Sequence, residues 1–141
     1  MFFLDRSTGK QLALNLRILG LNVETHDSHF RQNALDVEWL AKCGEQGWVV
    51  ISSDRAIKAN SLEKRVLLES GVAAFFFTSA NLTSIQQFEL FTKAITRVAR
   101  LVVEERRPFI ARVGKDGSIE LWLNYLGEDL IAMKQKRRRL A

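Results

Sequence analysis

The sequence contains only one cysteine and one proline among its 141 residues. Because Cys43 has no partner in the chain, an internal disulfide and a zinc site built from cysteines are both excluded. We therefore expect the protein to work in a reducing compartment, the cytoplasm. Long apolar runs are also missing, and the opening run 2–4 is too short for a signal peptide or a membrane span.

Motifs that would direct the chain toward other chemistry are absent as well. The sequence holds no Gly-x-Gly-x-x-Gly pattern and no glycine-rich lysine loop, which argues against binding of a nucleotide cofactor. No serine or cysteine stands in a nucleophile pattern. Hydrophobic residues make up 47% and charged residues 26% of the chain, as in ordinary globular proteins, so we predict one domain with a substantial core.

The net charge of +5 is concentrated near the carboxyl terminus. Without the five basic residues at positions 134 to 139, basic and acidic residues balance at 16 each. We therefore predict a neutral domain over residues 1–133 and a basic, mobile tail over residues 134–141. Such a tail can also touch nucleic acid through non-specific phosphate contacts.

Apolar runs alternate with helical patterns through most of the sequence. Strand-like runs occupy residues 2–4, 21–26, 49–51 and 72–78. Apolar residues recur at helical spacing in segments 7–19, 35–43, 61–70 and 84–105. This alternation predicts a three-layer α/β/α fold with a central, mostly parallel sheet. Two later runs, 109–113 and 118–123, flank a Gly-Lys-Asp-Gly turn and predict an antiparallel hairpin at one sheet edge, followed by a helix over 124–133.

Two local interpretations complete this outline. The segment 26–30 contains both histidines and is interpreted as a polar loop, and we leave the histidines out of any metal site because they lack a wider ligand set. The first helix is predicted to place one broad apolar face on the core, formed by Leu12, Leu14, Leu16, Ile18 and Leu19.

The central run from Val49 to Ile51 has no polar alternation, which is typical of a strand covered on both faces. Parallel sheets bind ligands at the carboxyl ends of their strands, so Asp54, shortly after this run, is the first candidate for chemistry. Arg55 and Lys58 follow and would attract an anion. Asp54 can equally be a helix N-cap, because aspartate is favoured at that position.

Two other carboxylates occupy comparable places. Asp5 follows the first strand-like run, and Asp36 opens the helix before the central run, so both can converge with Asp54 on one cleft. Three carboxylates without cysteine or paired histidine ligands are hard oxygen donors, which suit Mg²⁺ or Mn²⁺ better than zinc. A divalent cation would also relieve the repulsion among them.

These residues resemble a known family. The opening Phe-Phe-Leu-Asp-Arg-Ser, the Asp-Val-Glu-Trp-Leu segment beginning at Asp36, and the Trp-Val-Val-Ile-Ser-Ser-Asp run ending at Asp54 are similar, in order and spacing, to PIN-like domains. The compact subgroup related to VapC-type toxin ribonucleases is the most similar. This resemblance implies a metal-dependent endoribonuclease that hydrolyses RNA, the toxin of a type II toxin–antitoxin pair, with Mg²⁺ or Mn²⁺ as cofactor. Its implied partners are RNA and a cognate antitoxin protein, and an edge hairpin with an apolar helix can support a homodimer.

By the same resemblance, Asp5, Asp36 and Asp54 are the catalytic and metal-binding residues. Asn81 stands roughly where larger PIN domains carry a fourth acid, and Glu38 is the substitute if Asp36 only caps its helix. Four basic residues are candidates for holding the RNA backbone, although each alone is more often a solvated surface charge: Arg6, Lys10, Arg55 and Lys58.

Two rival functions stay open at this stage. A receiver-like phosphoacceptor domain also gathers acids at strand ends, but the residues after the 72–78 run supply no lysine for it. The stronger rival is a non-catalytic PIN-like module that binds RNA or a protein without cutting, because a site with three acids and no fourth can be catalytically poor.

Overall fold

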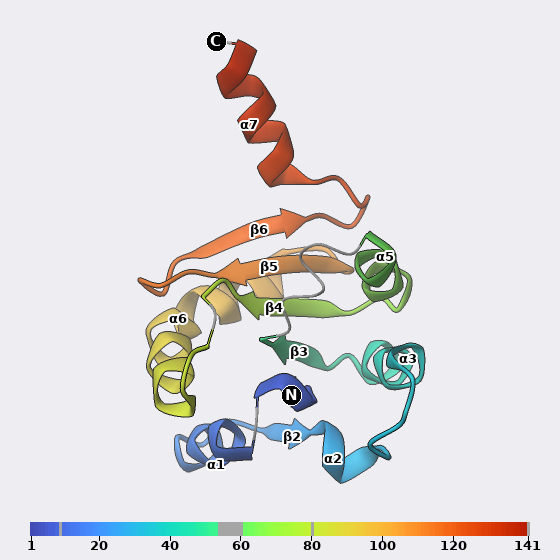
Figure 1. The fold of residues 1–141 in the computed structure, drawn as a ribbon, viewed down its shortest axis with the longest axis vertical. Helices are drawn as coiled ribbons and strands as arrows, with labels where there is room; N and C mark the ends of the chain where they lie inside the picture. Colours follow the sequence, from blue (N-terminus) through green and yellow to red (C-terminus); the bar gives the residue numbers. More distant parts are fainter. Residues whose placement is uncertain (9, 54–60, 80, 141) are drawn as a thin grey trace.

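The computed structural model describes residues 1–8, 10–53, 61–79 and 81–140. Asp54, Arg55 and Lys58 lie outside the described residues, so their roles stay predictions. Strands and helices alternate along the described chain (Figure 1). In order, the elements are β1 (Phe2–Leu4), η1 (Arg6–Thr8), α1 (Lys10–Ile18), β2 (Val23–Thr25), α2 (His26–His29), α3 (Asp36–Gln46), β3 (Val49–Ser52), α5 (Ser61–Glu69), β4 (Ala73–Phe77), α6 (Ser84–Glu104), β5 (Phe109–Val113), β6 (Ile119–Leu123) and α7 (Leu130–Leu140).

The strands form a six-stranded sheet in the order β2-β1-β3-β4-β5-β6. β1 lies between β2 and β3, with Leu4 opposite Thr25 on one side and opposite Ile51 on the other. Every neighbouring pair from β2 to β5 is parallel, whereas β6 pairs antiparallel with β5. The predicted α/β fold with a mostly parallel sheet and an antiparallel hairpin at one edge is therefore confirmed.

Helices cover both faces of the sheet, with α1 and α6 on one side and α3 and α5 on the other (Figure 1). Successive strand residues supply the two cores in alternation: Val49 and Ile51 pack with α1 and α6, whereas Val50 packs with α3 and α5. All three are at most 3% exposed. Full burial of such a side chain stabilises the fold by about 1.5–3 kcal/mol. Burial on both faces explains why this strand is continuously apolar.

The broad apolar face predicted for α1 is only partly buried. Leu12 and Leu16 are fully buried, but Leu14, Ile18 and Leu19 are 50%, 82% and 53% exposed. Leu12 and Leu16 are four residues apart and share one side of the helix, whereas Leu14 and Ile18 point to the opposite side. Leu19 follows the last residue of the helix. The prediction therefore assigned too many leucines and isoleucines to the core.

Boundaries predicted for the middle helices are near the observed ones. α3 ends at Gly47, whose φ of 70° is left-handed and suits a glycine C-cap. α6 begins after Thr83, whose side chain accepts a hydrogen bond from the Gln86 main-chain N–H at 3.1 Å in a capping box. The predicted polar loop over 26–30 instead contains α2, and its His26 is buried. None of the helices in the described ranges is both long and apolar enough to cross a membrane.

The terminal helix begins later than predicted and continues further. Within the predicted helix 124–133, Gly127 has a φ of 76° and the Asn124 side chain accepts two main-chain hydrogen bonds, so residues 124–128 form a turn. α7 then spans Leu130–Leu140 and includes the five basic residues assigned to the tail. Lysine, glutamine and arginine are good helix formers, which the prediction overlooked.

Candidate active site at the carboxyl edge of the sheet

The carboxyl ends of the parallel strands meet at one edge of the sheet. Asp5 follows β1 directly, and its main-chain N–H donates to the Ile51 carbonyl of β3 at 3.2 Å. Ser52 is the last residue of β3, and Thr78 follows β4. Polar side chains from separate strands therefore stand side by side at this edge, as the sequence predicted for Asp5.

Serine hydroxyl groups contact both carboxylate oxygens of Asp5. Ser52 Oγ donates to Asp5 Oδ2 at 2.5 Å. Ser7 contacts Asp5 Oδ1 twice, through its hydroxyl and through its main-chain N–H, the latter at 3.0 Å. Asp5 is only 9% exposed, so these donors replace most of the water that a carboxylate would otherwise bind. The Asp5 side chain is thus fixed in position.

The same serines connect η1 to the end of β3. Ser53 donates from its main-chain N–H to Ser7 Oγ at 3.0 Å and from its hydroxyl to the Ser7 carbonyl at 2.8 Å. Ser7 Oγ also lies 3.2 Å from Ser52 Oγ. The sequence analysis gave no site role to Ser7, Ser52 or Ser53. The parallel register could have indicated the contact, because Leu4 pairs with Ile51 and the next residues are Asp5 and Ser52.

Asp36 is the first residue of α3 and accepts a hydrogen bond from Trp39 Nε1 at 2.9 Å. Asp5 and Asp36 line the same two cavities, of about 140 and 210 Å³. The smaller one is otherwise mainly apolar and is bounded by Leu40, Val66 and other side chains of α3, α5 and the sheet. The structure therefore brings together two of the three predicted carboxylates.

The larger of these cavities has polar and basic walls. Arg6 lines it together with the buried His26, and Arg6 Nη1 donates to the Gln32 carbonyl at 2.9 Å. Arg6 and Lys10 also line a small neighbouring cavity with Asp5. Two of the basic residues proposed for RNA contact thus lie beside Asp5. His26, which we left out of the metal site, also lines this cavity.

Comparison with known proteins gives the family. The model of the family described as PIN like domain matches residues 1–79, more than half of the chain. This chain belongs to the PIN-like domain family. It is also similar to "Putative ribonuclease VapC45" of Mycobacterium tuberculosis, at 29% identity over 103 residues, which cover 70% of this chain and 75% of that protein. No solved structure matches the chain.

The PIN-like match contains Asp5, Asp36 and Asp54 and ends just before Asn81. In the structure, Asn81 has a left-handed φ of 54° and lines a separate cavity of about 710 Å³ with residues of α6. Glu38 is exposed on α3 and does not line either cavity shared by Asp5 and Asp36. Neither Asn81 nor Glu38 lines a cavity that Asp5 also lines, and their roles stay predictions.

The donor set around Asp5 consists of oxygen atoms. Asp5 and Asp36 supply carboxylates, and Ser7 and Ser52 supply hydroxyl groups beside them. Within residues 1–8, 10–53, 61–79 and 81–140, no three side chains from histidine, cysteine, aspartate or glutamate gather closely enough to hold a metal ion. The third predicted carboxylate, Asp54, lies outside those ranges. Hard oxygen donors of this kind suit Mg²⁺ or Mn²⁺.

Proposed function

We propose that this protein is a metal-dependent endoribonuclease that hydrolyses RNA phosphodiester bonds. The observation that carries the proposal is the pair Asp5 and Asp36, which come from separate elements and line two shared cavities at the carboxyl edge of a PIN-like sheet. The printed name of the mycobacterial relative, a ribonuclease, supports the same reaction class.

In this proposal Asp5, Asp36 and Asp54 hold Mg²⁺ or Mn²⁺. Asp5 fits the role because it is a buried carboxylate that lines the cavities shared with Asp36, and the hydroxyl groups of Ser7 and Ser52 hold it in one orientation. When bound, such a cation supplies a nucleophilic water at neutral pH and stabilises the charge that develops on the phosphate. Ser7 and Ser52 are positioning residues, since they fix the orientation of Asp5 before substrate arrives.

Basic residues bind the substrate in the same proposal. Arg6 and Lys10 line the small cavity beside Asp5 and bring positive charge to the place where a phosphate would lie. Arg55 and Lys58 follow Asp54 in the sequence and are proposed to contact the RNA backbone as well. These contacts hold RNA without reading its sequence.

Cleavage of a labelled single-stranded RNA by the purified protein tests the proposal. We expect cleavage with Mg²⁺ or Mn²⁺, none with a chelator, and none from Asp5→Asn, Asp36→Asn or Asp54→Asn. Asp116→Asn is the matched control, because Asp116 lies in the β5–β6 turn, where it accepts a hydrogen bond from the Ser118 main-chain N–H at 3.0 Å. Wild-type protein that binds RNA but never cuts it across several metals and substrates would favour the non-catalytic PIN-like module.

We further propose that the protein is the toxin of a type II toxin–antitoxin pair and acts on cytoplasmic RNA. The name of the mycobacterial relative, VapC45, supports this assignment. Expression of the wild type alone should arrest growth, and Asp5→Ala or co-expression of the cognate antitoxin should relieve the arrest. Unaffected growth with active, well-expressed protein would contradict the toxin assignment and leave the nuclease assignment standing.

A homodimer is the last part of the proposal. The side of α1 that faces away from the core exposes Leu14 and Ile18, with Leu19 just beyond the helix, and burying these apolar side chains against a second copy would be favourable. Light scattering after size-exclusion chromatography should give a dimer for the wild type and a monomer for Ile18→Glu. A monomeric wild type would refute this part alone.

A further inference from the structure

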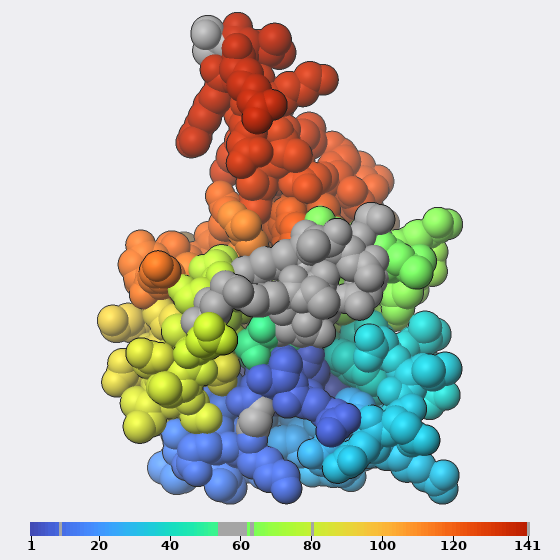
Figure 2. All heavy atoms as spheres, viewed as in Figure 1, coloured from blue at the N-terminus to red at the C-terminus, as the bar shows by residue number. Residues whose placement is uncertain are grey.

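Helix α7 projects from the body of the protein beyond the edge strand β6 (Figures 1 and 2). Among the described residues, the hydrogen bonds that tie it to the sheet lie at its start. Asp129 accepts hydrogen bonds from the main-chain N–H groups of Ile131 and Ala132 at 3.1 and 2.9 Å, and Trp122 Nε1 of β6 donates to the other Asp129 oxygen at 3.3 Å. No residue of α7 is buried. The helix is thus anchored at one end, and the rest of its length contacts solvent.

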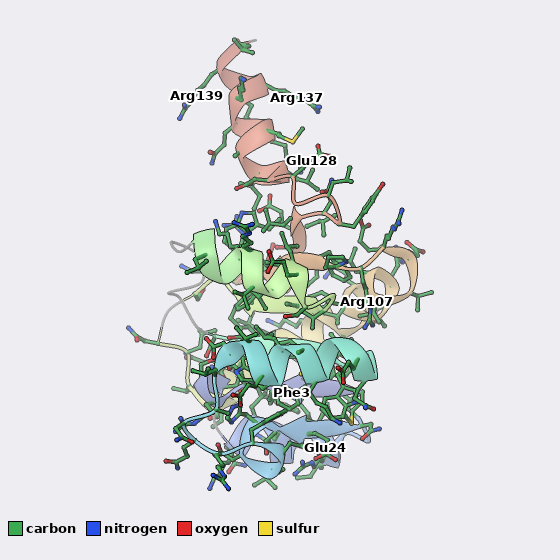
Figure 3. The ribbon with its side chains drawn as sticks, turned by 90° about the vertical axis from the view of Figure 1, so that its right-hand side faces the viewer. Phe3, Glu24, Arg107, Glu128, Arg137 and Arg139 are labelled. Atoms are coloured by element: carbon green, nitrogen blue, oxygen red, sulfur yellow. The ribbon has the colours of Figure 1, made fainter. Side chains whose placement is uncertain are left out.

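The free part of α7 is positively charged all the way round. Its 11 residues contain no acid, and five are basic: Lys134, Lys136, Arg137, Arg138 and Arg139. At about 100° per residue, these five positions cover every side of the helix. Figure 3 shows Arg137 and Arg139 pointing to opposite sides of it. Within the described part of the chain, none of the five forms an ion pair.

A helix of this kind is poorly stabilised by itself. An isolated helix shorter than about 12 residues is marginal in water, and like charges three or four residues apart destabilise it further. Lys134 and Arg138 are such a pair, as are Lys136 and Arg139. A polyanion would relieve this repulsion on every side of the helix. A protein partner would need an apolar stripe, but Leu140 is the only apolar residue of α7 after Met133.

Lys134, more than one turn into α7, lies at the same sheet edge as the candidate active site. Lys134 lines a cavity of about 560 Å³ with Thr78, Arg112 and Gly114. Thr78 follows β4 and Gly114 follows β5, whereas Asp5 follows β1, and all these strands are parallel. Positive charge from α7 therefore begins near the carboxyl edge where Asp5 lies, and it extends outward for roughly 9 Å, the rise of the six residues from Lys134 to Arg139.

We propose that α7 is an RNA-binding arm that holds the phosphate backbone of the substrate at a distance from the cleavage site. The choice of RNA as the polyanion rests on the proposed function. The arm contributes affinity through counterion release and does not discriminate between sequences. Its occupant is a nucleic-acid backbone, because the charge on all sides of the helix complements phosphates. The exposed apolar residues Met133 and Leu140 are seven positions apart, with basic residues between them, and form no continuous stripe for a protein.

Binding of a labelled 30-nucleotide RNA in the presence of a chelator tests the arm without cleavage. The main variant replaces all five basic residues of α7 with glutamine, which keeps helix propensity and alters no buried side chain. For single-stranded RNA, each phosphate contact adds about 0.7 to the salt slope, so between 50 and 200 mM salt the wild type should lose about a hundredfold more affinity than this variant.

Two matched double variants distinguish an effect of the charges on α7 from an effect of the net charge of the protein. Lys136→Gln/Arg138→Gln removes two charges from α7, and Lys42→Gln/Arg100→Gln removes two exposed charges from α3 and α6. We expect only the first pair to weaken binding and to lower the salt slope. Equal effects of the two pairs, or an unchanged slope in the fivefold variant, would overturn the proposal. Loss of affinity for an acidic peptide but not for RNA would overturn it in favour of a protein partner.

The same samples, assayed with Mg²⁺, separate this proposal from the nuclease assignment. α7-dependent binding by a protein that never cuts supports the arm and refutes the nuclease. A protein that cuts RNA but binds it equally well without the basic residues of α7 supports the nuclease and refutes the arm. Thermal unfolding of each variant should match the wild type, and circular dichroism should show at least as much helix, because removing like charges from α7 relieves repulsion.

Discussion

Replacing Ser52 with alanine tests whether the hydroxyl groups around Asp5 support the candidate site. Ser52 is fully buried, and its hydroxyl donates to Asp5 Oδ2 at 2.5 Å, whereas Asp5 itself is 9% exposed. Ser52→Ala therefore removes a donor from a carboxylate that has little access to water as a replacement. A hydrogen bond to a charged group contributes about 1.5–3 kcal/mol, so we expect the free energy of unfolding to fall by that amount.

Two variants make the measurement specific. Ser53→Ala removes a neighbouring hydroxyl that donates to the Ser7 carbonyl at 2.8 Å and is expected to cost only about 0.5–1.5 kcal/mol, because that bond joins neutral groups. Ser52→Thr keeps the hydroxyl and should restore most of the loss. The free energies come from urea denaturation in metal-free buffer, followed by tryptophan fluorescence and extrapolated linearly to water.

A double-mutant cycle with Asp5→Asn decides whether the loss arises from the contact itself. Once the charge of Asp5 is removed, Ser52→Ala should cost less, and the coupling should lie within about 0.5–3 kcal/mol. Equal losses from Ser52→Ala and Ser53→Ala, or a coupling near zero, would refute the reasoning. If the protein is a nuclease, Ser52→Ala should also lower its activity by about 10- to 100-fold, as loss of a residue that orients a metal ligand does.

Further predictions concern metal, pH and the site residues. Mn²⁺ should raise the thermal midpoint of the wild type, and Asp54→Asn should remove most of that gain. Without metal, the Asp54→Asn variant should be as stable as the wild type or more stable, because one repelling carboxylate is gone. An equal metal response in both proteins would contradict the metal-site assignment. Burial raises the pKa of the Cys43 thiol to about 12 from an ordinary value of 9.0. As the pH rises, the thiol therefore ionises in the unfolded chain before it ionises in the folded one. The free energy of unfolding should be unaffected by this thiol below pH 9 and fall between pH 9 and 12. This pH dependence should be weaker in Cys43→Ala, and an identical dependence in the two proteins would refute the role of the thiol. Asp5→Ala should abolish RNA cleavage, and Asn81→Ala should reduce it less, because Asn81 lines a different cavity. Equal losses of activity in the same assay would show that Asn81 belongs to the active site.

Local patterns in the sequence were sufficient to predict the order of the strands and of the longer helices. They were also sufficient to place Asp5 in the candidate site. The apolar runs ending at Leu4 and Ile51 mark buried strands, because both faces of a parallel sheet must be covered. A carboxylate directly after such a run, as at Asp5, then falls at the binding edge of the sheet. Gly20 and Gly47 follow α1 and α3 and adopt left-handed φ values of 91° and 70°, as glycines after a helix commonly do.

Only the tertiary structure decided which side chains meet. Ser7 contacts Asp5 because a short turn follows β1, and Ser52 contacts it because of the register of β1 against β3. Neither contact can be predicted from the hydrophobic periodicity of the sequence. Burial of α1 depended in the same way on which side α6 covers, so Leu14 looked like a core residue although it faces solvent. The sequence by itself determined the strands, the longer helices before α7 and the charge of the last segment, because propensity, hydrophobic period and charge are properties of neighbours along the chain. The site and the exposed course of α7 depend on contacts between residues distant in the chain, and those are set by packing.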